Sequence, residues 1–291
     1  MRNTFIKKLT DLAEYNKNIF LLVADIGYGV VEEFESKYPN RFLNVGVAEQ
    51  NMTGVAAGLA AEGYHVFTYS IANFPTFRCA EQIRNDIDYH NLPVTVVSVG
   101  GGVAYGNLGY SHHAVQDYGL MRMMPNFTIA SPGDPNEVEG VLAYLLKNPG
   151  PSYLRLGKNN EVNITKKNKQ LKPGNWYGLK NNKGIDEVIL STGTALQWLL
   201  KNKEKFVNKD IYTLPIWGGN LKHCQQKFYS KFSSIITVED HIFDCGFGSW
   251  FRESVSISKT NKEIKSYALP SKLTYLAGSQ DKIMENLNLY N

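Results

Sequence analysis

A carboxylate and a pair of histidines are the side chains of this sequence best suited to proton chemistry. Glu49 stands at the start of an apolar helical segment and is surrounded by glycine and alanine. Taken alone, it could be a partly exposed helix carboxylate, because the helix macrodipole favours negative charge in the first turn. His112 and His113 lie in a glycine-rich loop after a predicted strand. Such loops form the carboxyl edge of a parallel sheet, where ligands bind, although a single loop histidine can also be a surface residue.

The first half of the chain must supply the elements that position these side chains. Apolar, strand-like runs cover residues 19–25, 94–102, 127–132 and 151–157. Helices are expected after Asn44, over 77–90 and over 135–146; the last begins with proline followed by glutamates, as helix N-termini prefer. Continuous apolar strands that alternate with helices indicate a mostly parallel sheet covered on both faces.

The second half begins with a polar, lysine-rich stretch and then becomes regular again. The stretch from 159 to 185 contains a proline and two Asn-Asn pairs, which predicts a linker or a surface excursion. Beyond it, strands are expected over 187–193 and 233–240, and helices over 194–200 and 248–257. We therefore predict a first domain over 1–158, a linker over 159–185 and a smaller α/β domain over 186–291.

The composition excludes several classes of protein. Hydrophobic residues make up 43% of the 291 residues, charged residues 20%, and the net charge is only +4, as in soluble globular proteins. No basic stripe or nucleic-acid motif is present, and no apolar run reaches the ~18 residues of a membrane span. The start lacks the pattern of a secretory signal, and three scattered cysteines suggest neither disulfides nor a zinc site. We expect a cytoplasmic protein with no nucleic-acid or membrane partner.

Four segments, taken in order, resemble the transketolase family over almost the whole chain. They read NVGVAEQNMTGVAAGLAAEG, IANFPTFRCAEQIRNDI, YGNLGYSHHAVQDYGLMRMMPNFTIASPGDPNEV and VEDHIFDCGFGSWFRE. The resemblance implies a parallel-sheet pyrimidine-binding domain of a thiamine diphosphate enzyme, followed by a smaller α/β transketolase C-terminal domain.

In this resemblance Glu49 is the carboxyl that activates thiamine diphosphate. A carboxyl bonded to ring nitrogen N1′ favours the imino tautomer whose amino group takes a proton from the thiazolium carbon, and partial burial suits it by raising its pKa. Phe74 holds the position of an aromatic residue that stacks on the pyrimidine, and Phe77 assists it. Ile71 holds a position that is often aromatic in the family. Ordinary core packing is the alternative role for both phenylalanines.

The loop histidines are assigned to the substrate by the same resemblance. The family pattern of glycine, any residue, Ser or Thr, and histidine matches the segment from Gly109 to His112. His112 would contact the substrate carbonyl or donate a proton to it. His113 is the second candidate for a substrate contact.

Three positions depart from the family pattern of enzymes that act on sugar phosphates. Gly100 replaces a phosphate-binding histidine, Leu108 an aspartate that binds a hydroxyl, and Lys158 a phosphate-binding arginine. Lysine still meets phosphate, but as a point charge rather than a planar fork. We expect these changes, with the side-chain-free run 100–102, to open volume for an acceptor that is not a simple aldose phosphate, such as a nucleotide-linked keto sugar.

An absent motif indicates that the chain works with a second protein. Full-length relatives carry Gly-Asp-Gly and a later asparagine, which hold the diphosphate through Mg²⁺; this sequence has no Gly-Asp-Gly. The chain therefore resembles the C-terminal subunit of split transketolases, with Mg²⁺ bound by a companion N-terminal subunit in a heterotetramer. Two alternatives stay open: a 2-oxoacid dehydrogenase beta chain, which the loop GYSHHAVQDYGLMR disfavours, and an inactive partner-binding scaffold, which the intact Glu49 segment disfavours.

Overall fold

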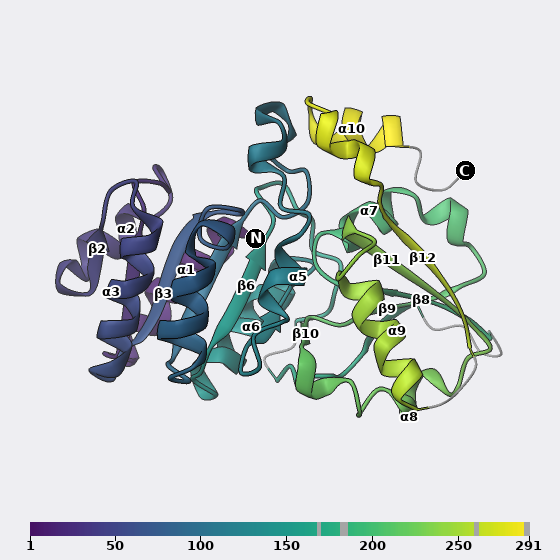
Figure 1. The fold of residues 1–291 in the computed structure, drawn as a ribbon, viewed down its shortest axis with the longest axis horizontal. Coiled ribbons are helices and arrows are strands. Elements are labelled where there is room, and N and C mark those ends of the chain that lie inside the picture. Colours follow the sequence, from purple (N-terminus) through teal and green to yellow (C-terminus); the bar gives the residue numbers. More distant parts are fainter. Residues whose placement is uncertain (168–169, 181–185, 259–261, 288–291) are drawn as a thin grey trace.

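Two sheets lie side by side in the computed structural model, which describes residues 1–167, 170–180, 186–258 and 262–287 (Figure 1). Helices flank both sheets, and the strands within each sheet are mostly parallel. This confirms the predicted α/β class with a larger sheet followed by a smaller one.

The first sheet has the strand order β10-β5-β6-β4-β3-β1-β2. Its strands are β1 (Ile19–Val23), β2 (Phe42–Asn44), β3 (His65–Ile71), β4 (Val94–Val99), β5 (Thr128–Ala130), β6 (Ser152–Leu156) and β10 (Ile216–Trp217). The helices are α1 (Arg2–Tyr15), α2 (Glu32–Lys37), α3 (Glu49–Ala61), α4 (Ala80–Gln82), α5 (Asp117–Met121) and α6 (Pro135–Lys147). The central strands β1, β4 and β6 are buried along their whole length, which explains their continuous apolar sequences.

Local sequence signals correctly mark the start of α6 but do not predict the irregular form of the segment 77–90. At the start of α6, the carboxylate of Asp134 accepts the N–H of Glu137 at 2.8 Å and Pro135 occupies the first turn. The segment expected to be one helix over 77–90 is instead a 3₁₀ turn (Phe77–Cys79), the short α4 and a π-helical stretch (Ile83–Asp88). Such irregular turns occur often beside functional sites.

The second sheet has the order β12-β11-β8-β9-β7. Its strands are β7 (Tyr177–Lys180), β8 (Glu187–Ser191), β9 (Asp210–Thr213), β11 (Ser234–Ile242) and β12 (Glu263–Leu269). Its helices are α7 (Ala195–Lys201), α8 (Gln226–Tyr229), α9 (Phe247–Ile257) and α10 (Gln280–Leu287). Strand β7 falls inside the predicted linker and pairs antiparallel with β9, so this part of the polar stretch belongs to the sheet; residues 168–169 and 181–185 of that stretch lie outside the described part.

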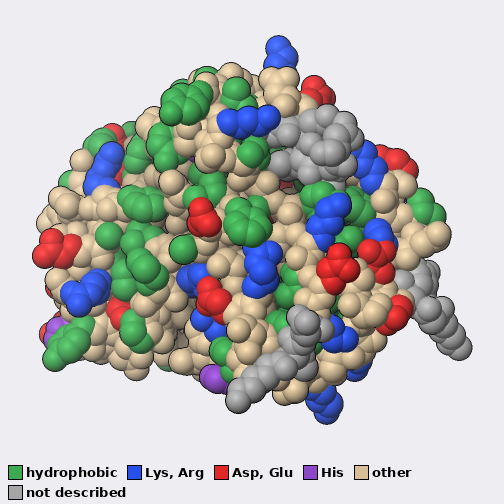
Figure 2. Space-filling view, turned by 45° about the vertical axis from the view of Figure 1, so that its right-hand side comes forward, with side chains coloured by type: hydrophobic (Ala, Val, Ile, Leu, Met, Phe, Trp, Pro, Cys, Tyr) green, Lys and Arg blue, Asp and Glu red, His purple; other side chains and the backbone are tan. Residues whose placement is uncertain are grey.

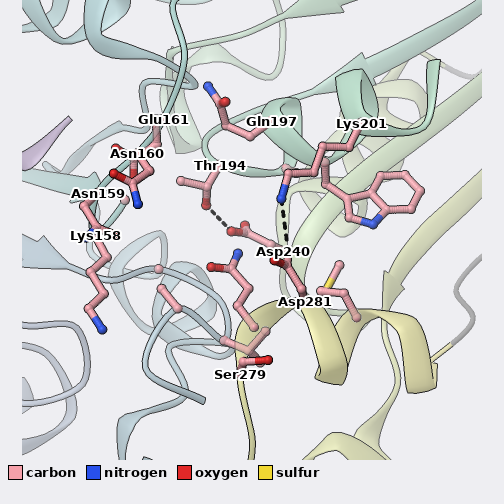
Figure 3. Close-up of a pocket in the computed structure, with 18 of the residues that line it drawn as sticks. Lys158, Asn159, Asn160, Glu161, Thr194, Gln197, Lys201, Asp240, Ser279 and Asp281 are labelled. Atoms are coloured by element: carbon pink, nitrogen blue, oxygen red, sulfur yellow. Dashed lines mark hydrogen bonds and ion pairs between the residues drawn. The ribbon is translucent and has the colours of Figure 1, made fainter. Parts of the chain in front are cut away.

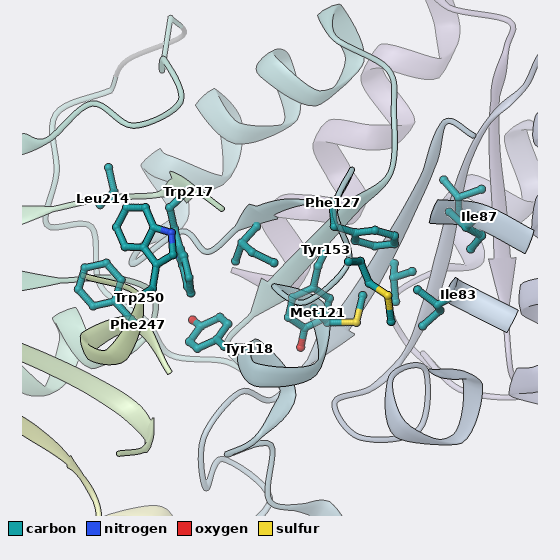
Figure 4. Close-up of a cluster of buried hydrophobic side chains, with 14 of the residues drawn as sticks. Ile83, Ile87, Tyr118, Met121, Phe127, Tyr153, Leu214, Trp217, Phe247 and Trp250 are labelled. Carbon is teal, nitrogen blue, oxygen red and sulfur yellow. The ribbon is translucent and has the colours of Figure 1, made fainter. Parts of the chain in front are cut away.

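The two halves share one hydrophobic core. Strand β10 comes from the second half of the chain but pairs with β5 of the first sheet. A continuous cluster runs from Ile83 past Tyr118 to Trp217 and Trp250 (Figure 4). The rings of Tyr118 and Trp217 meet edge to face at 5.2 Å. The two halves of the chain are therefore packed together through a shared sheet edge and a shared hydrophobic cluster.

Charges of both signs are mixed on the face of the molecule seen in Figure 2, where lysine and arginine side chains are interspersed with aspartate and glutamate. Within the described part of the chain, no helix combines the length and apolar character that a membrane crossing requires.

Candidate active site

The carboxyl edge of the first sheet collects the positions named from the sequence. Strands β3, β4 and β6 are neighbours, and Ile71, Val99 and Leu156 pair at the same level of the sheet. Gly100 follows β4 and Lys158 lies just beyond β6. Ligands of open parallel sheets bind outside this edge, so the strand register by itself brings distant parts of the sequence to one site.

Glu49 is buried at the first turn of α3 and is only 2% exposed. Its Oε2 atom forms an ion pair with Nη1 of Arg78 at 2.6 Å. Its Oε1 atom has no hydrogen-bond partner among the residues that the structure describes. One carboxylate oxygen is thus held in place and the other is available to a ligand.

Arg78 connects this carboxylate with the aromatic group expected to hold a flat ligand. Its guanidinium lies 4.5 Å from the centroid of the Phe74 ring, a cation–π distance. Its side chain is 45% exposed, so Arg78 joins the buried carboxylate to the protein surface. Sequence reasoning missed Arg78; the available signal was an arginine only four residues after Phe74 in a family-like segment.

Phe74 also contacts the substrate-loop histidine. The rings of Phe74 and His112 meet edge to face at 5.1 Å. Because Arg78 contacts both Glu49 and Phe74, these four side chains form one chain of contacts. Burial lowers the pKa of His112, and its Nδ1 atom lies 2.9 Å from the hydroxyl of Ser111. The neutral imidazole is therefore favoured near pH 7.

Asn73 fastens the loop that carries both histidines. Its side-chain amide donates to the backbone oxygen of His113 at 2.5 Å. The His113 ring is fully buried, and neither ring nitrogen has a hydrogen-bond partner within the described ranges. Burial lowers the pKa of His113. The His113 side chain is therefore buried beneath its own loop and lacks the exposure that a direct substrate contact requires.

Ile71 and Phe77 have less definite positions. Ile71 ends β3 and is half-buried at the sheet edge. Phe77 is 47% exposed and makes no ring contact with the other aromatic side chains that the structure describes. Of the aromatic candidates, only Phe74 is tied to Glu49 and His112.

The expectation of open volume at 100–102 is wrong. A Cβ atom built on Gly100 would lie 2.2 Å from the Tyr105 ring, and one on Gly101 would lie 2.6 Å from the guanidinium of Arg155. The space that a side chain at Gly100 or Gly101 would take is filled by Tyr105 and Arg155, so the missing side chains make room for neighbouring side chains. Leu108 is 57% exposed on a 3₁₀ turn (Gly106–Leu108), and the ammonium of Lys158 lies 4.4 Å from the Tyr105 ring centroid.

A buried ionic network contacts the backbone of the substrate loop at Ala114. Sequence reasoning did not predict this network. Arg155 on β6 donates to Asp117 at 2.7 Å, to Asp240 at 2.6 Å and to the backbone oxygen of Ala114 at 2.7 Å. Thr194 of the second half donates to the same Asp240. The signal was an arginine inside the apolar run PSYLRLG, because a buried charge must be paired.

A separate cavity of about 370 Å³ lies between the two halves and does not include Glu49, Phe74 or His112. Its lining includes Lys158, Thr194, Gln197, Lys201, Asp240, Ser279 and Asp281 (Figure 3). Lys201 and Asp281 pair across it at 3.1 Å, while Lys158 extends away from Thr194 and Asp240. We place the candidate chemistry at the sheet edge, because the convergent carboxylate, aromatic ring and histidine lie there. In the described residues, no group of three or more histidine, cysteine, aspartate or glutamate side chains is arranged to hold a metal ion.

The fold and this edge define an α/β protein with a ligand site at the carboxyl ends of a parallel sheet. Residues 1–162 match the family described as transketolase, pyrimidine binding domain. The chain is 30% identical to a putative transketolase C-terminal section of Methanocaldococcus jannaschii, over 91% of this chain and 84% of that protein. It is 28% identical to one of the subunits of an apulose-4-phosphate transketolase of Actinobacillus succinogenes, over 88% of this chain and 83% of that one.

A solved structure extends the similarity across both sheets. It is described as a split gene transketolase, inactive beta4 tetramer, and matches with a TM-score of 0.82 and 26% identity over 99% of this chain and 93% of that chain. The chain belongs to the transketolase family, and the resemblance to the C-terminal subunit of split transketolases is confirmed.

Proposed function

We propose that this chain is the C-terminal subunit of a two-chain, thiamine diphosphate-dependent enzyme that transfers a two-carbon ketol unit to a carbonyl acceptor. The observation that carries the proposal is the buried Glu49 carboxylate, which has one oxygen fixed by Arg78 and one without a partner in the described chain, beside the Phe74 ring. Domains over 1–158 and 186–291 remain our proposed division, with β7 as an outlying strand of the second.

The residues at the edge fit the pyrimidine half of the cofactor. A carboxyl oxygen without a partner suits a ring nitrogen, and a half-buried phenylalanine suits a flat ring. When bound, thiamine diphosphate supplies the nucleophilic carbon and the amino group that ketol transfer requires. Glu49 would hold a proton at N1′, Phe74 would support the ring, and Arg78 would keep the carboxylate oriented through its ion pair.

His112 would act on the substrate. Its ring contacts Phe74, so it stands beside the proposed pyrimidine position, and its neutral form can donate a hydrogen bond to a carbonyl oxygen. Asn73 and the Arg155 network would keep the loop in position from two sides. The chain's own contribution is then one proton-holding carboxyl, one aromatic support and one polar contact to the acceptor or donor.

The need for a companion chain is supported by the kinds of relatives found. Two are named as a section or subunit of a transketolase, and the solved split-gene structure is an inactive assembly of beta chains. We propose that the companion binds the diphosphate and Mg²⁺, and that two copies of each chain form a heterotetramer. The substrate would be a small sugar or keto compound.

The acceptor is proposed to differ from a simple aldose phosphate. Leu108 stands where a hydroxyl-binding aspartate is expected, and Tyr105 takes the space beside Gly100 where a phosphate-binding histidine is expected. A site that lacks a polar partner for a substrate group loses discrimination in favour of that group. A nucleotide-linked keto sugar stays our example of the alternative.

Reconstitution tests this proposal. The chain is mixed with a purified diphosphate-binding companion, thiamine diphosphate, Mg²⁺ and a ketose phosphate donor, and products from a panel of aldehyde and ketone acceptors are identified by mass spectrometry. Two-carbon extension of an acceptor is expected only with both chains. Acyl transfer to a lipoyl peptide would instead identify a 2-oxoacid dehydrogenase beta chain, and inactivity with every companion would identify a scaffold.

A further inference from the structure

Tyr105 occupies the space that the glycine turn leaves free. Gly100 has φ of +89°, a conformation that glycine adopts without strain. Two carbon atoms of the Tyr105 ring lie 2.2 and 2.3 Å from the position of a Cβ at residue 100. No residue with a side chain could stand at 100 unless this ring moved. The identity of residue 100 and the position of the Tyr105 ring, five residues later, therefore depend on each other.

Two of the residues assigned to the substrate lie near the Tyr105 ring. The Lys158 ammonium lies 4.4 Å from the ring centroid, and the His112 ring lies 6.4 Å away. The phenol oxygen has no hydrogen-bond partner in the part of the chain described here, and the side chain is only half-buried. Burial raises the pKa of Tyr105, so the phenol keeps its proton at neutral pH and can donate it in a hydrogen bond.

A ring used only for packing would not need these neighbours. A cation–π contact at a partly exposed site contributes only about 0.5–1 kcal/mol. This is enough to orient the lysine but too little to prevent it from pairing with an anionic ligand. Lys158 makes no ion pair within the described residues. Both the ammonium and the phenol are thus available to a ligand, and both stand on the His112 side of the edge.

We propose that Tyr105 is a substrate-contacting specificity residue: its phenol donates a hydrogen bond to an oxygen of an acceptor whose anionic group is bound by Lys158, while its ring closes the space beside Gly100. The inference rests on the proposed function and narrows its substrate class to carbonyl compounds that carry a negative group. A phosphate monoester and a nucleotide diphosphate both supply a negative group; because the proposed function disfavours simple aldose phosphates, the monoester serves as the comparison in the test. The filled space beside Gly100 confines the anionic group to the Lys158 side.

The test compares acceptors of different charge in the reconstituted complex. Glycolaldehyde serves as the neutral acceptor, glyceraldehyde 3-phosphate as the monoester and a uridine diphosphate-linked keto sugar as the diphosphate. Tyr105→Phe should raise the KM for the anionic acceptor in use about three- to tenfold, as expected for one lost hydrogen bond. The KM for glycolaldehyde, which has no negative group for Lys158 to bind, should rise less than that for the anionic acceptor.

Two further variants separate the roles of ring, phenol and charge. Tyr105→Ala removes the platform under Lys158 and should raise the KM for the anionic acceptor more than Tyr105→Phe does. Lys158→Met should bring the KM for anionic acceptors toward that for neutral ones. Tyr15→Ala, at an 84% exposed position at the end of α1, is the matched control and should change none of these values.

The outcomes distinguish this inference from the proposed function. If wild type consumes donor and both Tyr105 variants keep every acceptor KM within twofold, Tyr105 is a packing residue and the inference is overturned while the proposed function stands. If Tyr105→Ala does not fold, Tyr105→Phe alone decides. If wild type consumes no donor with its companion, the proposed function and this inference both fail.

Discussion

The exposed edge of the first sheet and the buried junction between the two halves use charge in opposite ways. At the edge, Glu49 has one oxygen without a partner in the described chain, and Lys158 contacts only an aromatic face. At the junction, Arg155 meets two carboxylates, two backbone oxygens and the phenol of Tyr118, all within 3.2 Å. The edge keeps polar atoms available, whereas at the junction all three guanidinium nitrogens of Arg155 have partners.

This difference separates residues that act from residues that hold them in place. A buried charge whose hydrogen bonds are complete has no capacity for a ligand, but removing one partner leaves an uncompensated charge. A side chain at a ligand site must retain unused hydrogen-bonding capacity and therefore contributes less to stability. Substitutions at the edge should mainly change activity, and substitutions at the junction should mainly change the free energy of unfolding.

The largest activity effect is expected for Glu49→Gln. The amide keeps the size of the carboxyl but cannot hold the proton at N1′, so turnover of the reconstituted enzyme should fall by at least about 10²–10⁴-fold. Thermal unfolding of the isolated chain should change little. Glu62→Gln, at the exposed C-terminal end of the same helix, is the control. Turnover of Glu49→Gln within a few-fold of wild type would mean that Glu49 is not the activating carboxyl.

At the junction, Arg155→Met should destabilise the fold by about 3–5 kcal/mol, because it leaves Asp117 and Asp240 buried without their cation. Urea denaturation of the isolated chain measures this. Lys37→Met, which breaks an exposed ion pair with Glu33, should change the free energy of unfolding far less. Equal effects of the two substitutions would contradict the distinction between a buried and an exposed pair.

Two buried carboxyls, Glu137 on α6 and Glu239 on β11, should also make stability depend on pH. Burial raises the pKa of Glu137 from 4.5 to about 8, and burial raises that of Glu239 likewise. Each folded-state carboxyl keeps its proton where the unfolded chain has lost it, so this contribution is full below pH 4.5 and is lost as pH rises to about 8. The slope is at most about −1.4 kcal/mol per pH unit for each group.

Urea midpoints at pH 5.5 and 8 measure this loss, and Glu137→Gln should reduce it. Glu33→Gln should leave it unchanged, because a hydrogen bond from Lys37 lowers the pKa of Glu33 and moves its titration away from this window. If wild type and Glu137→Gln lose the same stability between pH 5.5 and 8, Glu137 is not protonated in the fold.

The smallest of these effects concerns the aromatic support. Phe74→Ala should weaken thiamine diphosphate binding to the reconstituted complex by about two- to twelvefold, the range of one aromatic stacking contact of about 0.5–1.5 kcal/mol. The dissociation constant can be followed by cofactor-dependent quenching of tryptophan fluorescence. Phe77→Ala is the matched comparison, because Phe77 makes no described ring contact, and should change it less. The reverse order would exchange the roles of the two rings.

The sequence allowed the edge to be predicted better than the junction, for a physical reason. Glu49, Phe74 and His112 each lie in a short segment whose neighbours are informative, and the parallel strands then bring the segments together. The partners of Arg155 lie 38 and 85 residues away, and no local pattern connects them. Likewise, the empty side-chain positions at 100–102 suggested open space because the sequence does not show that the loop folds back and places the Tyr105 ring beside Gly100.

Cofactor binding by the isolated chain tests the central claim most directly. The claim is that this chain supplies one half of a cofactor site and a companion chain supplies the other. Isothermal calorimetry with thiamine diphosphate and Mg²⁺ should show weak binding to the chain alone, and tight, Mg²⁺-dependent binding together with turnover once the companion is added. Tight, Mg²⁺-dependent binding and turnover by this chain without any companion would contradict the claim.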